Sequence, residues 1–138
     1  MFVADNDTPT ISGTGSNPGL EVFSLPSMHR TARLTTGTPN ALPLGITVDS
    51  PENRVFVTNE GDGTIAAYSI APLKRLATLA AGRTPWLPAI DVPRGRLYVP
   101  SAMGDAFSVY DVRTLRPIFL AVPTCGYPTS IAIMEERT

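Results

Sequence analysis

Side chains suited to catalysis are scarce in this sequence of 138 residues. The chain has one histidine, His29, and one cysteine, Cys125, so it lacks the residues for a histidine-cluster metal centre, an internal disulfide or a multi-cysteine metal site. No histidine lies near Cys125 in the sequence to activate its thiol. We therefore predict an inert cysteine, a surface histidine and no catalytic residue.

One short segment has the oxygen ligands that calcium prefers. Glu60-Gly61-Asp62-Gly63-Thr64 is too short for an EF-hand loop, however, and it lacks the closing bidentate glutamate. Its Asp-Gly pair is typical of the tip of a β-hairpin. We interpret the segment as a turn, and we expect no metal site, no other cofactor and no dependence of folding on divalent metals.

Other side chains are suited to binding a ligand without catalysis. Trp86 offers an aromatic platform and Arg83 a donor for an anion. The alternative for Trp86 is that it fills a gap between structural repeats. The candidate ligand-binding residues are Arg83, Trp86, Tyr127, Asn59 and Glu60.

Short repeated strands would have to position these side chains. Val55–Asn59 matches Leu97–Ser101, forty-two positions further on, and it also matches Phe2–Asn6 position by position. Further runs rich in Val, Ile, Phe and Tyr recur in the same order, separated by Gly, Pro, Asn and Asp. Four strands in about 42 residues are typical of a β-propeller blade. We predict one all-β domain over 1–138, a partial β-propeller with repeats at about 1–42, 43–84 and 85–127 and a trailing strand at 128–138.

The run Val55-Phe56-Val57-Thr58-Asn59 and the segment Gly61–Ile70 that follows it resemble the YVTN-repeat β-propeller family. The resemblance recurs three times over nearly the whole chain and implies four-stranded antiparallel blades. It does not specify function, because the family includes surface-layer proteins, lactonase-like enzymes and domains attached to redox enzymes. Pro100 departs from the pattern, and we expect its strand to end or bulge there because proline lacks the backbone donor.

The resemblance also implies the phase of the repeat. The strand that follows Pro43, Pro85 or Pro128 is the innermost strand, A, and the chain therefore runs B-C-D, A-B-C-D, A-B-C-D and a lone A. An open stack of three blades would expose apolar faces and unpaired strand edges. Ser130–Met134 of one chain can pair with Phe2–Asn6 of a second copy, which would close a six-bladed ring around a two-fold axis.

The same phase sorts the charged residues between two rims. The rim with the B-to-C turns is expected to be acidic, with Asp5, Glu21 and Glu60 among its members, and the opposite rim to be basic, with Arg33 among its members. The basic rim is either a set of ordinary polar turns or a docking face for an acidic protein. The insertion Asp7–Gly19 on the acidic rim is either a binding loop or a tolerated extension.

Overall charge and hydrophobicity exclude some functions. The net charge of −1 gives no electrostatic basis for nucleic-acid binding. No apolar run reaches the roughly 18 residues of a membrane helix. If Met1 is the true start, the cytoplasm is expected; if the chain is a piece of a longer protein, the cell envelope or secretion is open.

The A strands would line the channel with apolar side chains. The position after the proline, where the family often has histidine, holds Leu44, Trp86 and Thr129. We therefore expect a non-enzymatic binding or scaffold module that is part of a larger ring or assembles into one. The alternative is a lactonase-like hydrolase whose site is completed by other blades or by a partner.

Overall fold

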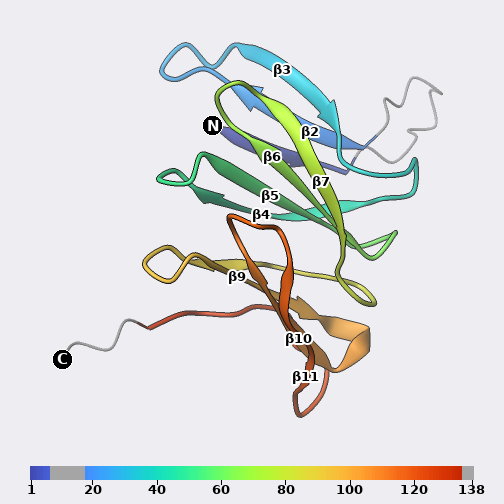
Figure 1. The fold of residues 1–138 in the computed structure, drawn as a ribbon. Coiled ribbons are helices and arrows are strands. Elements are labelled where there is room, and N and C mark those ends of the chain that lie inside the picture. Colours follow the sequence, from blue (N-terminus) through green and yellow to red (C-terminus); the bar gives the residue numbers. More distant parts are fainter. Residues whose placement is uncertain (7–17, 135–138) are drawn as a thin grey trace.

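The computed structural model describes residues 1–6 and 18–134. Their strands form three antiparallel sheets that follow one another along the chain (Figure 1). The first sheet contains β1 (Phe2–Asp5), β2 (Gly19–Phe23) and β3 (Arg30–Thr35). The second contains β4 (Pro43–Asp49), β5 (Arg54–Asn59), β6 (Thr64–Ser69) and β7 (Lys74–Ala80). The third contains β8 (Ala89–Asp91), β9 (Arg96–Ser101), β10 (Ala106–Asp111) and β11 (Pro117–Pro123), with the 3-10 turn η1 (Ala102–Gly104) between β9 and β10.

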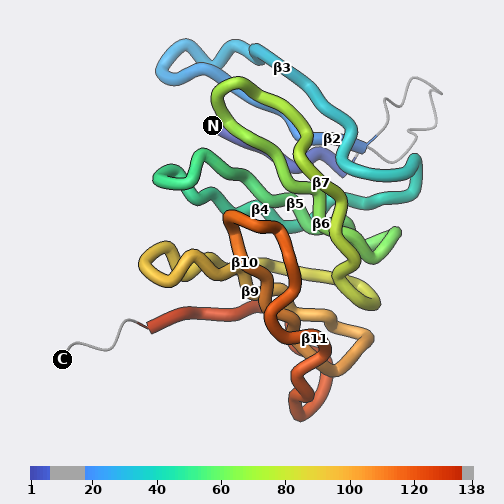
Figure 2. The backbone as a smooth tube through the Cα atoms, in the orientation of Figure 1, coloured from blue at the N-terminus to red at the C-terminus, as the bar shows by residue number. Residues whose placement is uncertain are grey.

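Within each sheet the strands pair in the order in which they occur along the chain. The sheets are stacked face to face like successive blades (Figure 2). The expected fold is thereby confirmed. The chain is a partial β-propeller with B-C-D in its first blade and A-B-C-D in its second and third blades. Within the described residues, no helix is long and apolar enough to cross a membrane.

The trailing A strand is the exception. Residues 129–134 form no regular strand. Their backbone pairing with the third blade is an isolated parallel bridge between Leu87 and Ser130, with the Leu87 amide donating to the Thr129 carbonyl at 3.1 Å. The expectation of a strand was therefore wrong for the described part of 128–138. The physical reason is that the described part of the chain offers no free B strand beside this segment to form a ladder with it.

Two apolar clusters hold the blades together. Val55, Val57, Ala66 and Tyr68 of the second blade pack against Leu20 of the first. On the other face of the second blade, a second cluster joins it to the third. The members of this second cluster are Phe56, Ile65, Ala67 and Ala81 of the second blade and Leu97, Val99, Tyr110 and Val112 of the third. The second blade, which lies between the other two, is apolar on both faces. Neighbouring residues of its strands point to opposite faces, so one set packs on the first blade and the other on the third.

The position-by-position match of Phe2–Asn6 with Val55–Asn59 was wrong by one residue. Phe2 pairs with Val22 as Phe56 pairs with Ala67, so Phe2 corresponds to Phe56. Both side chains face the following blade. A shift of one residue exchanges the two faces of a strand, and it places Val3 and Asp5 on the outer face of the first blade.

Pro100 neither ends nor bulges its strand, contrary to expectation. β9 continues to Ser101, and Pro100 pairs with Phe107 without a register shift. The carbonyl of Pro100 accepts a hydrogen bond from the Trp86 amide at 3.0 Å. The nitrogen of Pro100 points to the same side of β9 as this carbonyl, at a position beyond the end of the ladder between β8 and β9. The donor that proline lacks is not needed there.

Candidate functional site

Two of the predicted ligand-binding residues meet in a polar pocket at one rim. Glu60 and Arg83 line a pocket of about 360 Å³, which is formed by the B-to-C turn of the second blade, the connection from the second to the third blade, and Met103. Asp62 in the same turn accepts hydrogen bonds from the Thr38 amide at 3.1 Å and the Thr64 hydroxyl at 2.5 Å. Asp62 thus ties the turn to the preceding connection. Among the described residues, no group of three or more His, Cys, Asp or Glu side chains is placed to hold a metal ion.

Trp86 and Tyr127 form a separate aromatic pair. Their rings meet edge to face, with centroids 6.0 Å apart and an interplanar angle of 76°. Trp86 is half-buried, and its indole nitrogen is enclosed with no acceptor among the described residues. Tyr127 is exposed and is held by its amide, which donates to Asp105 at 2.8 Å.

Asn59 lies inside the molecule rather than on a binding surface. Its side chain is fully buried, and its amide donates to the Thr36 carbonyl and to the Thr64 hydroxyl, both at 2.9 Å. The structure therefore corrects its assignment as a ligand-binding candidate. Asn59 ends a B strand at the junction of two blades, and its role there is to join them.

His29 and Cys125 are both exposed. The surface position expected for His29 is confirmed.

Asp91 and Asp111 are held as anions in turns. The pKa of Asp91 is lowered, first by the hydrogen bond from Arg94, and that of Asp111 is lowered, first by the backbone amide of Thr114. These two groups are suited to fixing turns rather than to donating a proton.

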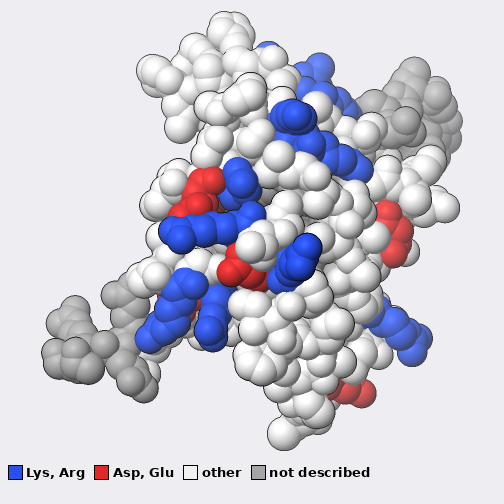
Figure 3. All heavy atoms as spheres, in the orientation of Figure 1, with Lys and Arg blue, Asp and Glu red and all other residues white. Residues whose placement is uncertain are grey.

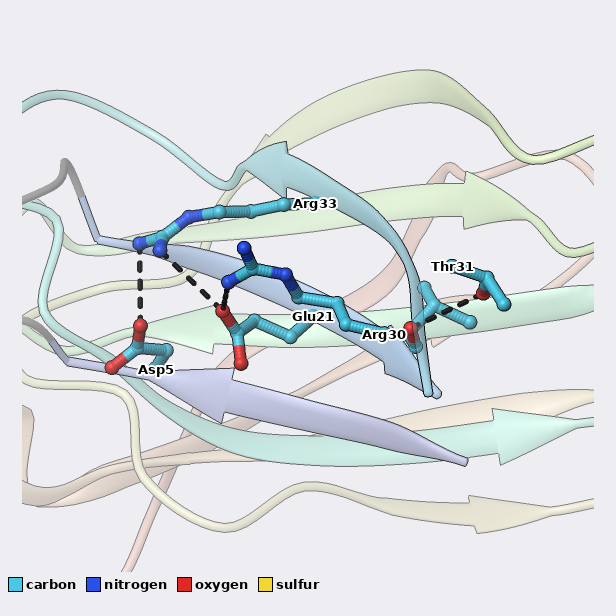
Figure 4. Close-up of polar contacts among 6 residues, drawn as sticks. Asp5, Glu21, Arg30, Thr31 and Arg33 are labelled. Carbon is cyan, nitrogen blue, oxygen red and sulfur yellow. Dashed lines mark hydrogen bonds and ion pairs between the residues drawn. The ribbon is translucent and has the colours of Figure 1, made fainter. Parts of the chain in front are cut away.

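The separation of charges into two rims was wrong for the first blade. Arg33 lies 3.2 Å from Asp5 and 3.4 Å from Glu21, although it was assigned to the opposite rim (Figure 4). Arg33 pairs directly with Glu21 across β2 and β3, so both side chains share one face of the sheet. Arg113 and Glu52, which were both expected on the basic rim, lie 2.6 Å apart, and Figure 3 shows acidic side chains among the basic ones on the visible face. Of the insertion Asp7–Gly19, residues 7–17 lie outside the described residues.

The ion pairs of the first blade cover its outer face. Glu21 accepts from Arg30 at 2.7 Å and is 14% exposed, so it is shielded by the two arginines (Figure 4). Leu20, the neighbour of Glu21, points the other way into the core. The free face of the first blade therefore carries a cluster of ion pairs beside the apolar side chain of Val3.

The free face of the last blade is apolar instead. One cavity of about 360 Å³ is lined by Arg96, Tyr98, Phe107, Val109, Phe119 and Val122. Beside it, Tyr98 and Phe107 line a second cavity of about 300 Å³ with Ile131, Ala132 and Ile133. We expected apolar faces at both ends of the stack. This expectation is confirmed for the last blade and was wrong for the first, whose free face carries ion pairs. The repeat spacing marks the residues of the apolar face. Tyr98 and Phe107 stand forty-two residues after Phe56 and Ile65, which are buried between the second and third blades.

Each junction between blades also carries a polar latch. The Tyr68 hydroxyl donates to the Thr35 carbonyl at 2.7 Å, and the Arg75 guanidinium donates to the same oxygen. At the next junction the Tyr110 hydroxyl donates to the carbonyl of Ala80. Both tyrosines lie on strand C, and both acceptors end strand D of the preceding blade.

Comparison with known proteins supports the fold and leaves the function open. No family model matches the chain, and no curated protein matches it. Hydrazine synthase of Kuenenia stuttgartiensis has a similar fold, with a TM-score of 0.72 and 16% identity over 91% of this chain and 36% of that chain. A functionally unknown protein from Desulfotomaculum acetoxidans DSM 771 gives a TM-score of 0.49 and 14% identity over 85% of this chain and 54% of that chain. This chain thus spans about a third of the hydrazine synthase chain that it matches.

Proposed function

We propose that the chain is a non-enzymatic binding or scaffold module that works through the free face of its last blade. One observation carries the proposal: two adjoining apolar cavities open on this face, and Phe119 at their edge is 54% exposed. Contiguous exposed apolar surface marks interaction sites in soluble proteins. Burying a phenylalanine fully contributes about 1.5–3 kcal/mol, so a few such side chains are enough to drive association.

A hydrolase of the lactonase-like type is supported less well by the site. Glu60, Asp62 and Arg83 are the charged residues that line the rim pocket, and Asp62 is engaged in hydrogen bonds of the turn. The A strands bring apolar side chains such as Ile46 and Ile90 to the inner part of the blades. We also propose that the chain is a member of the YVTN-repeat family, on the basis of the repeated sequence runs.

Fluorescence of the apolar dye ANS tests whether the free face can bind. We expect the wild-type chain to enhance ANS fluorescence and Phe119→Glu to lower the enhancement, because a charge then lies at the edge of the cavities. Leu25→Glu is the matched control, since Leu25 is 61% exposed in a turn of the first blade. Equal fluorescence of all three proteins would contradict the proposal, and so would turnover of a panel of lactones by the purified chain.

A further inference from the structure

We propose that the free face of the last blade accepts a further propeller blade, one that carries a small residue and a tyrosine on its strand C. We also propose that the chain's own first blade is excluded from this face by Glu21, Phe23 and Arg33. The proposal rests on the function proposed above and names the partner of that face.

The free face repeats a surface that is already covered by a blade within the chain. Tyr98 and Phe107 occupy the positions of Phe56 and Ile65, whose side chains are fully buried against the third blade. In the third blade the same two positions are only half-buried and line the cavities. The occupant that fits this arrangement of side chains is therefore another blade, just as the third blade fits the matching face of the second.

The two junctions of the chain show what such a blade must present. The middle of its strand C carries a small residue toward the preceding blade, Ala66 at one junction and Ser108 at the other. Two residues later it carries the latch tyrosine, Tyr68 or Tyr110. In the third blade Pro123 pairs with Ala106, and in the second blade Ala80 pairs with Thr64 at the same place. The carbonyl of Pro123 therefore corresponds to that of Ala80, which accepts the latch hydrogen bond, and it is placed to accept one from a following blade.

The first blade departs from this requirement at the corresponding positions. Glu21 stands where the other blades have Ala66 and Ser108, and Phe23 stands where they have tyrosine. Arg33, directly opposite Glu21, stands where the second blade has Thr78. A phenylalanine ring fills the space of a tyrosine but cannot donate the latch hydrogen bond.

Charge is the larger of the two obstacles. Docking the first blade against the apolar face would remove Glu21, Arg33 and Asp5 from water, and a buried ion pair regains its desolvation cost only with very good geometry. The absent hydroxyl forfeits one hydrogen bond, which is the smaller loss. This asymmetry weighs against the six-bladed ring closed by Ser130–Met134 and Phe2–Asn6 of two copies.

Changing the first blade to the residues of the second tests the inference directly. In Glu21→Ala/Phe23→Tyr/Arg33→Thr the first blade acquires the pattern of Ala66, Tyr68 and Thr78. We expect size-exclusion chromatography with light scattering to give the 14.7 kDa monomer for the wild type and twice that mass for the triple variant, which can close a ring of two copies. Phe23→Tyr alone should stay monomeric because the charges remain, and adding Phe107→Glu to the triple variant should restore the monomer.

Two results would overturn the inference. One is a folded triple variant that stays monomeric, together with the same result for a second version that has Glu21→Ser, the residue of the third blade. The other is a wild-type dimer that Phe107→Glu dissociates, because the face then accepts a surface of the native chain. ANS binding that responds to Phe119→Glu while the triple variant stays monomeric would retain the proposed function and reject only this partner.

Discussion

The hydroxyl of Tyr68 reaches across from the second blade to the carbonyl of Thr35 in the first, at 2.7 Å. The ring of Tyr68 is fully buried between the two blades, and the Arg75 guanidinium lies over it, 5.6 Å from its centroid. This contact joins residues thirty-three positions apart, so it stabilises the stacking of blades rather than a single sheet.

Removing the Tyr68 hydroxyl should weaken this junction modestly. Tyr68→Phe keeps the ring, and the Thr35 carbonyl keeps its bond from Arg75, so we expect a loss of about 1 kcal/mol in the free energy of unfolding. For a chain of this size that corresponds to a fall in melting temperature of roughly 3–5 °C. Urea unfolding measures the change, with Tyr127→Phe, an exposed tyrosine, as the control. Equal losses in both variants would show that the latch contributes nothing.

The two latch tyrosines predict a loss of stability at alkaline pH. Burial is the main cause that raises the pKa of both Tyr68 and Tyr110. A raised pKa in the folded state means that their contribution is present in full below the unfolded value of about 10 and is lost as the pH rises through the raised pKa. Tyr68→Phe should therefore flatten the alkaline fall of the melting temperature relative to wild type. An alkaline limb that is unchanged in Tyr68→Phe/Tyr110→Phe would contradict this.

Trp86 serves as a fluorescent probe of the aromatic pair with Tyr127 because it is the single tryptophan of the chain. It is half-buried against the exposed ring of Tyr127. We expect iodide to quench its fluorescence partially, and Tyr127→Ala to increase the quenching constant by uncovering the indole. A fully shielded indole in both proteins would remove Trp86 from the candidate ligand-binding residues.

Calcium should leave the thermal stability unchanged. Asp62 accepts hydrogen bonds from Thr38 and Thr64, so it is engaged in the turn rather than in a cage of carboxylates. Thermal unfolding with calcium and with EDTA measures the difference. A melting temperature that rises by many degrees with calcium, and that loses this response in Asp62→Asn, would reveal a site that the turn does not suggest.

The sequence predicted the blades well because each depends on local patterns that repeat. Val55–Asn59 and Leu97–Ser101 share an alternation that fixes the same faces in both strands. Phe2–Asp5 was harder to place because Phe2, Val3 and Ala4 are all apolar, so either register gives an apolar face. Its pairing with β2, which points Leu20 into the core, settles the register.

The character of the two end faces depends on contacts that no single strand reveals. The sequence predicted Glu21 on the rim. Its pairing with Arg33 across the sheet places both side chains on the outer face of the first blade. The cavities at Phe107 arise because the corresponding position of the second blade is covered by the third blade, whereas no blade among the described residues covers Phe107. Both features follow from tertiary arrangement rather than from propensity.

A mixture of two complementary proteins tests whether the free face of the last blade accepts another blade while the native first blade is excluded from it. The first protein is the wild type, which has the apolar face but an excluded first blade. The second carries Glu21→Ala, Phe23→Tyr and Arg33→Thr together with Phe107→Glu, so it has a competent first blade and a disabled face. In sedimentation velocity we predict a one-to-one complex in the mixture and monomers for each protein alone. Monomers in the mixture would show that the free face does not accept a blade of this pattern, and association of the wild type with itself would show that the native first blade is not excluded.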